Sequence, residues 1–531
     1  MSSIPIGVAY SHISQFETRK DRPFTHCSLY ALFDGNDLRD SISSKSLMNT
    51  QNNSQLFAAI VDIDDQEMIE ILNYLSINVF FFHFTTNLFH TASRVLEILK
   101  IFPKMNAVAI CDDSKKWDCL SKLTEYHPKI TMASIFSKDA QQDYYWTSFP
   151  ISAVFLNELH FSETRSLLPE YRSLISDLMI RHIPVFVSCD MPDFNDYLDS
   201  LMHFHSFLIP CSGLYTFMDP LQPLAEHLSS SIYETFEGDQ SKYDQYTMAI
   251  SKALEKKGYD SIVAICGAGR GPIVDCAIKA GAINIYVVEK NHAASILLRS
   301  RLKNEWTGNI QFFEGDMRTI ELPNKIDILV TELLGGFGDN ELSPECIEGC
   351  ERFLGPDSLS IPSSYSSYLV PLTSSFLYTM AYNTNRLNLM SVSSLKGSFF
   401  MSNPQGCFEF QHPGTNILYQ RKTLEFVSEL EAEIHGFGGW FDSVLYDGVS
   451  LSSNPTEETS HLRSWFPVFF PIVKPIMVKK GQKIVLSFER KSSKTHVWYE
   501  WAVLQPEITP IHNPSGTQFA FGLSPVPIKY K

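Results

Sequence analysis

The sequence predicts an α/β fold built from successive domains, and three observations lead to this prediction. First, 531 residues are too many for one hydrophobic core. Second, short apolar, β-branched segments alternate with helical patterns up to about residue 360. Third, the helical periods then disappear, and short strands alternate with turn residues. We therefore expect a TIM-like (β/α) barrel over residues 1–205, a linker with helices over 206–257, a Rossmann-like domain over 258–360 and an antiparallel β-barrel domain over 361–531.

Eight candidate strands support a reduced barrel over residues 1–205, with helical segments between several of them. The region is short for that fold, and a flavodoxin-like sheet is the competing prediction. It carries no nucleophile, metal cluster or phosphate loop, which favours a docking or scaffold role. The candidate strands are Ile4–Ala9, Leu29–Phe33, Phe57–Ile63, Ile77–Phe82, Ala107–Cys111, Ile130–Ile135, Ile151–Leu156 and Ile183–Ser188, and the candidate helices are Asp65–Leu75, Leu88–Phe102, Lys115–Glu125 and Glu163–Arg181.

Composition narrows the class of protein. The chain is 44% hydrophobic and 19% charged, as in ordinary globular proteins. Its net charge of −16 opposes direct nucleic-acid binding, which needs a basic field, and would suit a cationic substrate. Ten cysteines without a CxxC pair indicate reduced thiols in an intracellular compartment. The most apolar stretch, Val79–Phe89, is too short to cross a bilayer. We expect a soluble, intracellular protein with no membrane partner.

The Rossmann-like region begins with a glycine turn between a strand and a helix. Gly267, Gly269 and Gly271 are followed by Pro272, so the spacing is GxGxG and lacks the third glycine of GxGxxG. A dinucleotide pyrophosphate fits this turn less well than it fits the full motif. The predicted strands are Ser261–Cys266, Asn284–Glu289, Ile310–Glu314 and Ile326–Thr331, and the predicted helices between the first three are Ile273–Ala280 and His292–Lys303.

Acidic residues follow the next two strands in the places where an adenosine would be held. Glu289 ends the second strand, where a carboxylate usually binds both hydroxyls of a ribose. Asp316 and Met317 follow the third strand and can meet an adenine edge, Asp316 by accepting from the exocyclic amine and Met317 through its backbone N–H. Adenosine without a pyrophosphate grip indicates S-adenosylmethionine.

The fourth strand leads into an acidic loop. Glu332 and Glu341 bracket a turn rich in glycine, and a helix is expected to follow with Ser343 at its N-cap, Pro344 at its first position and Gly355 past its end. Taken alone, the two glutamates could be solvated residues of a surface loop.

If a methyl donor binds opposite them, the carboxylates of Glu332 and Glu341 could bind the group that is methylated. A guanidinium is planar, carries five donors and stays protonated. Two carboxylates could hold it by paired hydrogen bonds, orient it and draw its positive charge toward the nitrogens they contact. The remaining nitrogen would then be the better nucleophile toward a methyl carbon on sulfur.

The loop sequence ELLGGFGDNELSPE resembles the double-glutamate loop of the protein arginine N-methyltransferase 5 family, the symmetric-dimethylating (type II) arginine methyltransferases. The resemblance extends from about residue 220 to the C-terminus. Its motifs include PLQPL (220–224), YETFEGDQSKYDQY (233–246), CGAGRGP (266–272), VVEK (287–290), GDMR (315–318), IPSSY (361–365), HGFGGWF (435–441), SWFPVFFPI (464–472) and VWYEWAV (497–503).

The resemblance implies a role for each matching residue. Glu332 and Glu341 would be the catalytic pair, with Lys242 near the donor's carboxylate. Phe236 would favour a symmetric product, and Trp465 would stack on the guanidinium. The implied donor-binding set is Tyr233, Lys242, Tyr243, Gly267, Gly269, Pro272, Glu289, Asp316 and Met317, and the implied substrate or product set is Phe236, Leu221, Trp465 and Phe466.

It also implies partners. We expect arginine-containing protein substrates such as histone tails and Gly/Arg-rich proteins, mono- and symmetric dimethylarginine as products, S-adenosyl-L-methionine as methyl donor and no metal. We further expect a homo-oligomer in cytoplasm and nucleus, and a WD-repeat partner on the N-terminal barrel, which the shortness of that barrel opposes. Two alternatives stay open. One is a catalytically weak scaffold of the same fold. The other is a nucleotide-dependent oxidoreductase, which leaves the paired glutamates without a role.

Overall fold

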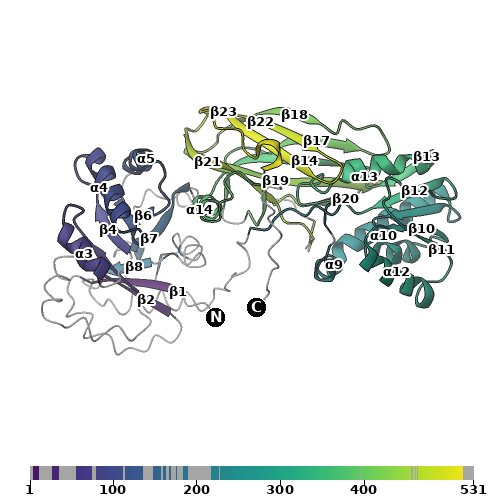
Figure 1. The fold of residues 1–531 in the computed structure, drawn as a ribbon, viewed down its shortest axis with the longest axis horizontal. Coiled ribbons are helices and arrows are strands. Elements are labelled where there is room, and N and C mark those ends of the chain that lie inside the picture. Colours follow the sequence, from purple (N-terminus) through teal and green to yellow (C-terminus); the bar gives the residue numbers. More distant parts are fainter. Residues whose placement is uncertain are drawn as a thin grey trace. The chain divides into compact units, whose positions relative to one another are not determined.

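A computed structural model describes residues 217–517 with short gaps at 227, 396–397, 456–458, 461 and 463. In the N-terminal part it describes 4–10, 27–34, 56–74, 79–111, 114–135 and 148–156, with single residues and short stretches from 160 to 188. The chain divides into two compact units (Figure 1). The first comprises residues 1–213 and 373–383, and the second comprises 214–372 and 384–531.

The described strands of the first unit form a closed parallel barrel. They pair in sequence order, and the last strand pairs with the first, an order that an open flavodoxin-like sheet does not have. Because the expected helix Glu163–Arg181 lies mostly outside the described residues, the full strand–helix alternation of a TIM-like barrel stays a prediction. The elements are β1 (Ile4–Tyr10), β2 (Cys27–Asp34), β3 (Leu56–Ile60), α3 (Gln66–Tyr74), β4 (Val79–His83), α4 (Leu88–Ile101), β5 (Asn106–Cys111), α5 (Ser114–Leu123), β6 (Ile130–Ile135), β7 (Ile151–Leu156) and β8 (Val185–Ser188).

Aromatic rings pack together within this barrel unit. Phe81 of β4 lies edge-on to Phe186 of β8, with 5.9 Å between ring centroids, and Phe155 of β7 stacks on Phe186 at 5.3 Å. A helix from much later in the chain, α14 (Ser375–Asn383), belongs to the same unit. Its first residue, Ser375, donates a hydrogen bond to the carbonyl of Phe149.

The second unit begins with a parallel sheet in the order β11-β10-β9-β12-β13. Its chain order reverses between β9 and β12, and ligands of such sheets bind at this switch point, beyond the carboxyl ends of the strands. The elements are α9 (Ser230–Glu237), α10 (Gln240–Lys257), β9 (Ile262–Cys266), α11 (Pro272–Lys279), β10 (Asn284–Glu289), α12 (His292–Asn304), β11 (Asn309–Glu314), β12 (Ile326–Thr331), α13 (Ser343–Cys350), a 3-10 turn η3 (Glu351–Phe353) and β13 (Leu354–Ile361).

Helix α10 is fixed against this sheet at both of its ends. The Asp239 carboxylate caps its first turn by accepting the N–H of Lys242 at 3.2 Å, and Gly258 follows its last residue with φ 102°. The apolar face of the helix packs into the core of the sheet, and the Tyr246 hydroxyl donates to the carbonyl of Thr331 at the end of β12 (2.9 Å). Lys242 is therefore held beside the edge where the acidic loop begins.

The strands after residue 360 form two antiparallel sheets. The larger has the order β15-β21-β19-β14-β16, with β17 and β20 also attached, and the smaller has the order β18-β22-β23. Among the described strands these pairings do not close into the expected barrel. The elements are β14 (Ser364–Thr373), β15 (Ser391–Val392), β16 (Phe399–Phe400), β17 (Gln405–Gln411), β18 (Gln420–Val427), β19 (Ala432–Tyr446), β20 (Val449–Ser452), β21 (Val468–Val478), β22 (Lys483–Ser492), β23 (Val497–Gln505) and a short 3-10 turn η4 (Pro514–Gly516).

The predicted boundaries are wrong around the acidic loop. The helix after it ends at Cys350 rather than before Gly355, which lies in β13, and Leu342 occupies the N-cap position in place of Ser343. The Ser343 hydroxyl donates to the Tyr365 hydroxyl at 2.8 Å instead of capping the helix. A tertiary hydrogen bond has thus replaced the local one that the sequence pattern predicts.

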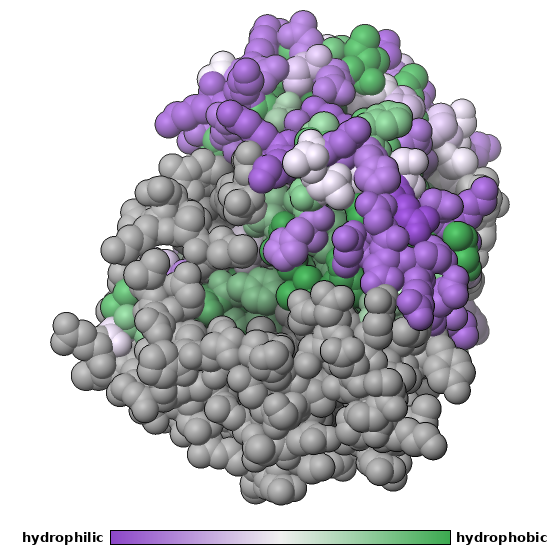
Figure 2. All heavy atoms as spheres, turned by 90° about the vertical axis from the view of Figure 1, so that its left-hand side faces the viewer, coloured by the Kyte–Doolittle hydropathy of each residue, from purple (hydrophilic) through white to green (hydrophobic). Residues whose placement is uncertain are grey.

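No described helix is long and apolar enough to cross a membrane. The face turned toward the viewer in Figure 2 carries mainly hydrophilic side chains where its residues are described. Single apolar residues such as Phe89 and Ile101 are exposed on α4. Within the same described ranges, no group of three or more His, Cys, Asp or Glu side chains is arranged to hold a metal ion.

Candidate active site

The glycine turn follows β9 at the switch point of the parallel sheet. Gly267 and Gly269 have φ values of 79° and 56°, where side chains other than glycine are strained. A Cβ on Gly267 would lie 2.8 Å from Leu333 Cδ2, and one on Gly269 would lie 3.0 Å from Tyr233 Cε1. Pro272 opens α11, one residue before the predicted start at Ile273, and proline is favoured at this first helical position. Glycine is therefore required both by the turn and by the side chains packed onto it.

Glu289 ends β10 and faces this turn with an almost fully buried side chain. Its Oε2 accepts the N–H of Gly269 at 2.8 Å, and its Oε1 accepts the N–H of Asn291 at 2.6 Å. Burial raises the pKa of Glu289, although these backbone N–H donors act in the opposite direction. The carboxylate is held rigidly at the place predicted for a ribose contact.

Tyr233 on α9 lies over the glycine turn. Its hydroxyl accepts a hydrogen bond from the Asn291 side chain at 3.2 Å, and the Asn291 side chain also caps α12. Burial, followed by the negative charge of Glu289, raises the pKa of Tyr233 to about 12. The phenol therefore stays neutral and covers one side of the glycine turn.

Asp316 and Met317 follow β11, where the sequence predicts the adenine contact. Arg318 donates to both carboxylate oxygens of Asp316, with the shortest contact 2.7 Å from Nη2 to Oδ2. Burial would raise the pKa of Asp316, but these hydrogen bonds from Arg318 lower it overall. Arg318 thus occupies acceptor positions that the adenine role would use, and that role stays a prediction. The Met317 side chain is buried beside Gly267.

Lys242 brings together several of the predicted residues. Its side chain is fully buried, and its Nζ lies 3.1 Å from Glu332 Oε2, directly after β12. The same ammonium lies 5.2 Å from the ring centroid of Phe236, 4.8 Å from that of Tyr243 and 5.2 Å from that of Trp465. Three aromatic faces and one carboxylate therefore surround a point that accommodates a buried cation.

Glu341 lies at the other end of the loop that Glu332 begins. Burial raises its pKa well above the ordinary range, repulsion from Glu332 raises it further, and the positive charge of Lys242 partly opposes both effects. The two glutamates are thus close enough to interact electrostatically. Their environments differ, because Glu332 pairs directly with an ammonium.

The loop between the two glutamates is folded tightly. Gly335 and Gly338 exchange backbone hydrogen bonds of 3.1 and 2.8 Å, and Phe337 between them inserts its fully buried ring among the rings of the β sheets. Gly338 has φ 83°, and a Cβ there would lie 3.0 Å from Phe441 Cβ. Trp465 holds the near side of the loop by donating from Nε1 to the carbonyl of Leu334 at 2.6 Å.

Two of the predicted substrate residues lie at the margin of this arrangement. Phe466 is 44% exposed, and its carbonyl oxygen lies so close to Gly336 that no side chain would fit there. Leu221 is partly exposed and precedes Gln222, which is buried and anchors its segment to the acidic loop. The Gln222 side chain donates to the carbonyl of Asn340 (3.4 Å) and pairs with the backbone of Val497.

Sequence reasoning missed the residues that support the site from behind. Asp239 accepts the N–H of Ser464 at 2.7 Å and so joins the Lys242 helix to the Trp465 segment. Asp339, in the middle of the acidic loop, is completely buried. Asp339 is a third acidic residue between Glu332 and Glu341, and this pattern in the sequence could have identified it as part of the site. The other missed residues, Gln222, Ser367, Arg490 and Tyr499, lie far away in sequence and carry no local signal.

Known proteins of one family resemble this chain over the region that contains these residues. A family model described as PRMT5 arginine-N-methyltransferase matches residues 212–361, and one described as PRMT5 oligomerisation domain matches residues 364–521. Protein arginine N-methyltransferase 5 of Xenopus laevis is 34% identical over 449 residues, 77% of this chain and 71% of that protein. Protein arginine N-methyltransferase skb1 of Schizosaccharomyces pombe is 31% identical, covering 76% of this chain and 74% of its own. Protein arginine N-methyltransferase 5 of Oryza sativa subsp. indica is 42% identical, and the match covers 57% of this chain and 50% of that protein.

Proposed function

The chain belongs to the protein arginine N-methyltransferase 5 family, and we propose that it transfers methyl groups from S-adenosyl-L-methionine to guanidino nitrogens of protein arginines. One observation carries the proposal. Glu332 and Glu341 stand together beside a cage of three aromatic rings, at the switch point of a parallel sheet. A cation-binding pair of carboxylates at that place suits an arginine side chain.

The residues of the donor side fit S-adenosylmethionine. Gly267 and Gly269 form a close turn on which a larger side chain would collide with its neighbours, and the carboxylate of Glu289 is fixed beside them. A ribose diol matches that carboxylate, and the buried ammonium of Lys242 matches the methionine carboxylate of the donor. When bound, S-adenosylmethionine supplies an electrophilic methyl group on sulfur.

The two carboxylates orient the arginine and manage its charge. Glu332 and Glu341 accept hydrogen bonds from guanidinium N–H groups and so fix the direction of the free nitrogen. Trp465 offers a ring face to the same cation. The methylated nitrogen must lose a proton. Burial raises the pKa of Glu341, so this carboxyl group is suited to take up that proton.

The product class rests on Phe236. Its ring lies in the cage around Lys242, next to the carboxylate of Glu332. In the resembling family, a phenylalanine at this position accompanies symmetric dimethylation. We therefore propose mono- and symmetric dimethylarginine as products, with histone tails and Gly/Arg-rich proteins as substrates.

We propose a homo-oligomer, which the oligomerisation-domain match over residues 364–521 supports. We also propose a WD-repeat partner on the N-terminal barrel and a location in both cytoplasm and nucleus. These two proposals are based on the family resemblance alone.

The test is methylation of a Gly/Arg-rich peptide and of a histone tail peptide by the purified full chain with S-adenosylmethionine. Fragment-ion mass spectrometry should find mono- and symmetric dimethylarginine, and peptides with lysine in place of arginine should stay unmodified. Asymmetric dimethylarginine alone would contradict the product class. Absence of any methylated arginine would favour the scaffold alternative. Binding of a nicotinamide nucleotide would favour the oxidoreductase.

A further inference from the structure

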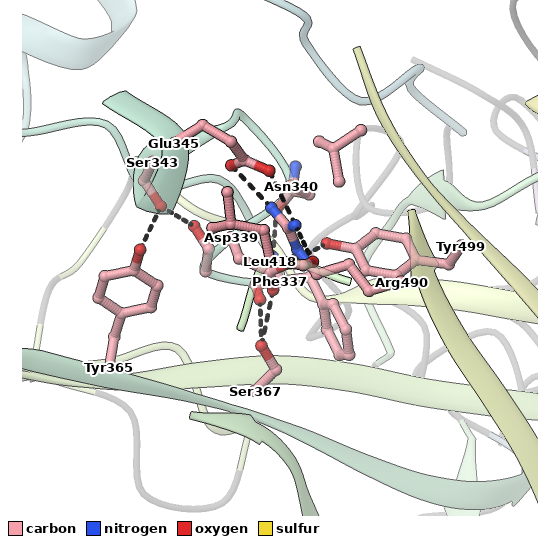
Figure 3. Close-up of polar contacts among 12 residues, drawn as sticks. Phe337, Asp339, Asn340, Ser343, Glu345, Tyr365, Ser367, Leu418, Arg490 and Tyr499 are labelled. Carbon is pink, nitrogen blue, oxygen red and sulfur yellow. Dashed lines mark hydrogen bonds and ion pairs between the residues drawn. The ribbon is translucent and has the colours of Figure 1, made fainter. Parts of the chain in front are cut away.

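The guanidinium of Arg490 contacts Asp339 and Glu345 (Figure 3), which stand before and after Glu341 in the sequence. From β22, its Nε–H donates to Asp339 Oδ2 at 2.5 Å, and its two terminal nitrogens donate to the two carboxylate oxygens of Glu345 at 2.9 Å each. Asp339 stands two residues before Glu341, and Glu345 stands four residues after it in the first turn of α13. One side chain from the β sheets therefore holds the loop both before and after the proposed catalytic carboxylate.

This ion group is buried and well supplied with hydrogen bonds. The side chains of Arg490 and Asp339 have no exposed surface. Arg490 also donates to the carbonyl of Leu418 at 2.7 Å, while the hydroxyls of Tyr499 and Ser367 donate to Asp339 at 2.8 and 2.9 Å (Figure 3). Burial opposes the charge of Arg490, but the neighbouring carboxylates raise its pKa overall, so it stays a cation. A buried network that is satisfied in this way is rigid.

The backbone that Arg490 holds is strained beside Glu341. Leu342 has φ 66° and ψ 26°, a left-handed conformation that is unfavourable for a residue with a side chain. On the other side of Glu341, Asn340 uses its side-chain oxygen to accept the N–H of Phe337 at 2.7 Å. Strained backbone persists only where its surroundings fix it, and the Arg490 network provides that fixation on both flanks.

We propose that Arg490 is a positioning residue for arginine methylation, which sets the place of the Glu341 carboxylate through Asp339 and Glu345. This inference rests on the proposed function of the glutamate pair. A clamp on a planar guanidinium works only if both carboxylates are aligned with it, and small displacements of such groups cost much of the rate. The β sheets thereby contribute to catalysis without touching the arginine.

The test is the full chain carrying Arg490→Lys, which keeps the charge but loses the fork that grips two carboxylates. We expect kcat for a Gly/Arg-rich peptide to fall by about 10- to 100-fold. The Kd for S-adenosylhomocysteine, measured by calorimetry, should change by less than about twofold. Arg386→Lys is the matched control, because Arg386 is also largely buried and pairs with Asp219 (2.8 Å) and Ser391, away from the loop. It should keep the parent kcat.

A double-mutant cycle separates positioning from a purely structural role. If Arg490 acts through Glu341, the losses from Arg490→Lys and Glu341→Asp should not multiply, whereas independent effects on folding would. Multiplying losses, or a kcat of Arg490→Lys equal to the parent's, would overturn the inference. Failure of the parent protein itself to methylate arginine would instead overturn the proposed function. If Arg490→Lys does not fold, Tyr499→Phe removes one donor to Asp339, and we expect its kcat to fall by roughly fivefold.

Discussion

The donor half and the acceptor half of the site are built in different ways. On the proposed donor side, Glu289 is held by the backbone of Gly269, 20 positions away, and by that of Asn291, two positions after it. On the acceptor side, the loop is held by Trp465 across 131 positions and by Arg490 across 151. The proposed donor side therefore depends on one sheet edge, whereas the proposed arginine clamp depends on the antiparallel sheets that pack behind it. Variants should affect the two halves separately.

The largest effect is expected for Glu341→Gln. Loss of one carboxylate leaves a buried guanidinium half-paired, which costs about 3 kcal/mol or more, or roughly 150-fold in kcat/KM for a Gly/Arg-rich peptide. Binding of S-adenosylhomocysteine, measured by calorimetry, should change little because the donor half is untouched. Glu348→Gln, on the following helix, should behave as the parent. Equal losses of kcat/KM in Glu341→Gln and Glu348→Gln would contradict the proposed clamp.

A smaller effect on the opposite half is expected for Glu289→Gln. An amide is uncharged and offers one acceptor oxygen, so a bound ribose would lose one of its two proposed hydrogen bonds to this carboxylate. At about 1.5–3 kcal/mol for a hydrogen bond to a charged group, the Kd for S-adenosylhomocysteine should rise by roughly 10- to 150-fold. Calorimetry tests this, with Glu321→Gln on the surface as control. An unchanged affinity would place the donor elsewhere.

Trp465→Phe should produce a loss of about fivefold in kcat/KM for the peptide. The ring is kept, but the hydrogen bond from Nε1 to the carbonyl of Leu334 is lost, at about 1 kcal/mol. Steady-state kinetics with varied peptide measure the change. Trp498→Phe, which removes a similar hydrogen bond to Glu500 on β23, is the control. If donor affinity falls instead, the two halves are not separable at this residue.

The smallest effect concerns stability. Because the folded-state pKa of Glu341 is raised, the stability it contributes is present below the ordinary glutamate pKa and is lost as pH rises through the raised value. Glu341→Gln should therefore melt roughly 2 °C above the parent at pH 8, and the difference should shrink toward pH 4.5. Thermal unfolding at several pH values measures it. A pH-independent difference would contradict the raised pKa.

Local signals in the sequence predicted that Gly267, Gly269 and Glu289 lie together at neighbouring strand ends, where the structure has them. Glycines between a strand and a helix, and a glutamate at the end of the next strand, lie within a few tens of residues and follow chain order. Both glutamates of the clamp were also predicted, from the same edge. Their support was not, because Arg490 lies in an ordinary charged stretch of a strand, and only tertiary packing reveals that it is buried. The N-cap at Leu342 was missed for the same reason.

Helix α14 has a consequence for how the protein is made. The chain leaves the second unit after Leu372, supplies residues 373–383 to the first unit and then returns. A ribosome releases the N-terminus first, and domains generally fold in that order. Here the N-terminal unit lacks one of its helices until residue 383 has been synthesised. A polypeptide cut at residue 213 would likewise lack it, so the boundary in sequence is not the boundary of the folding unit.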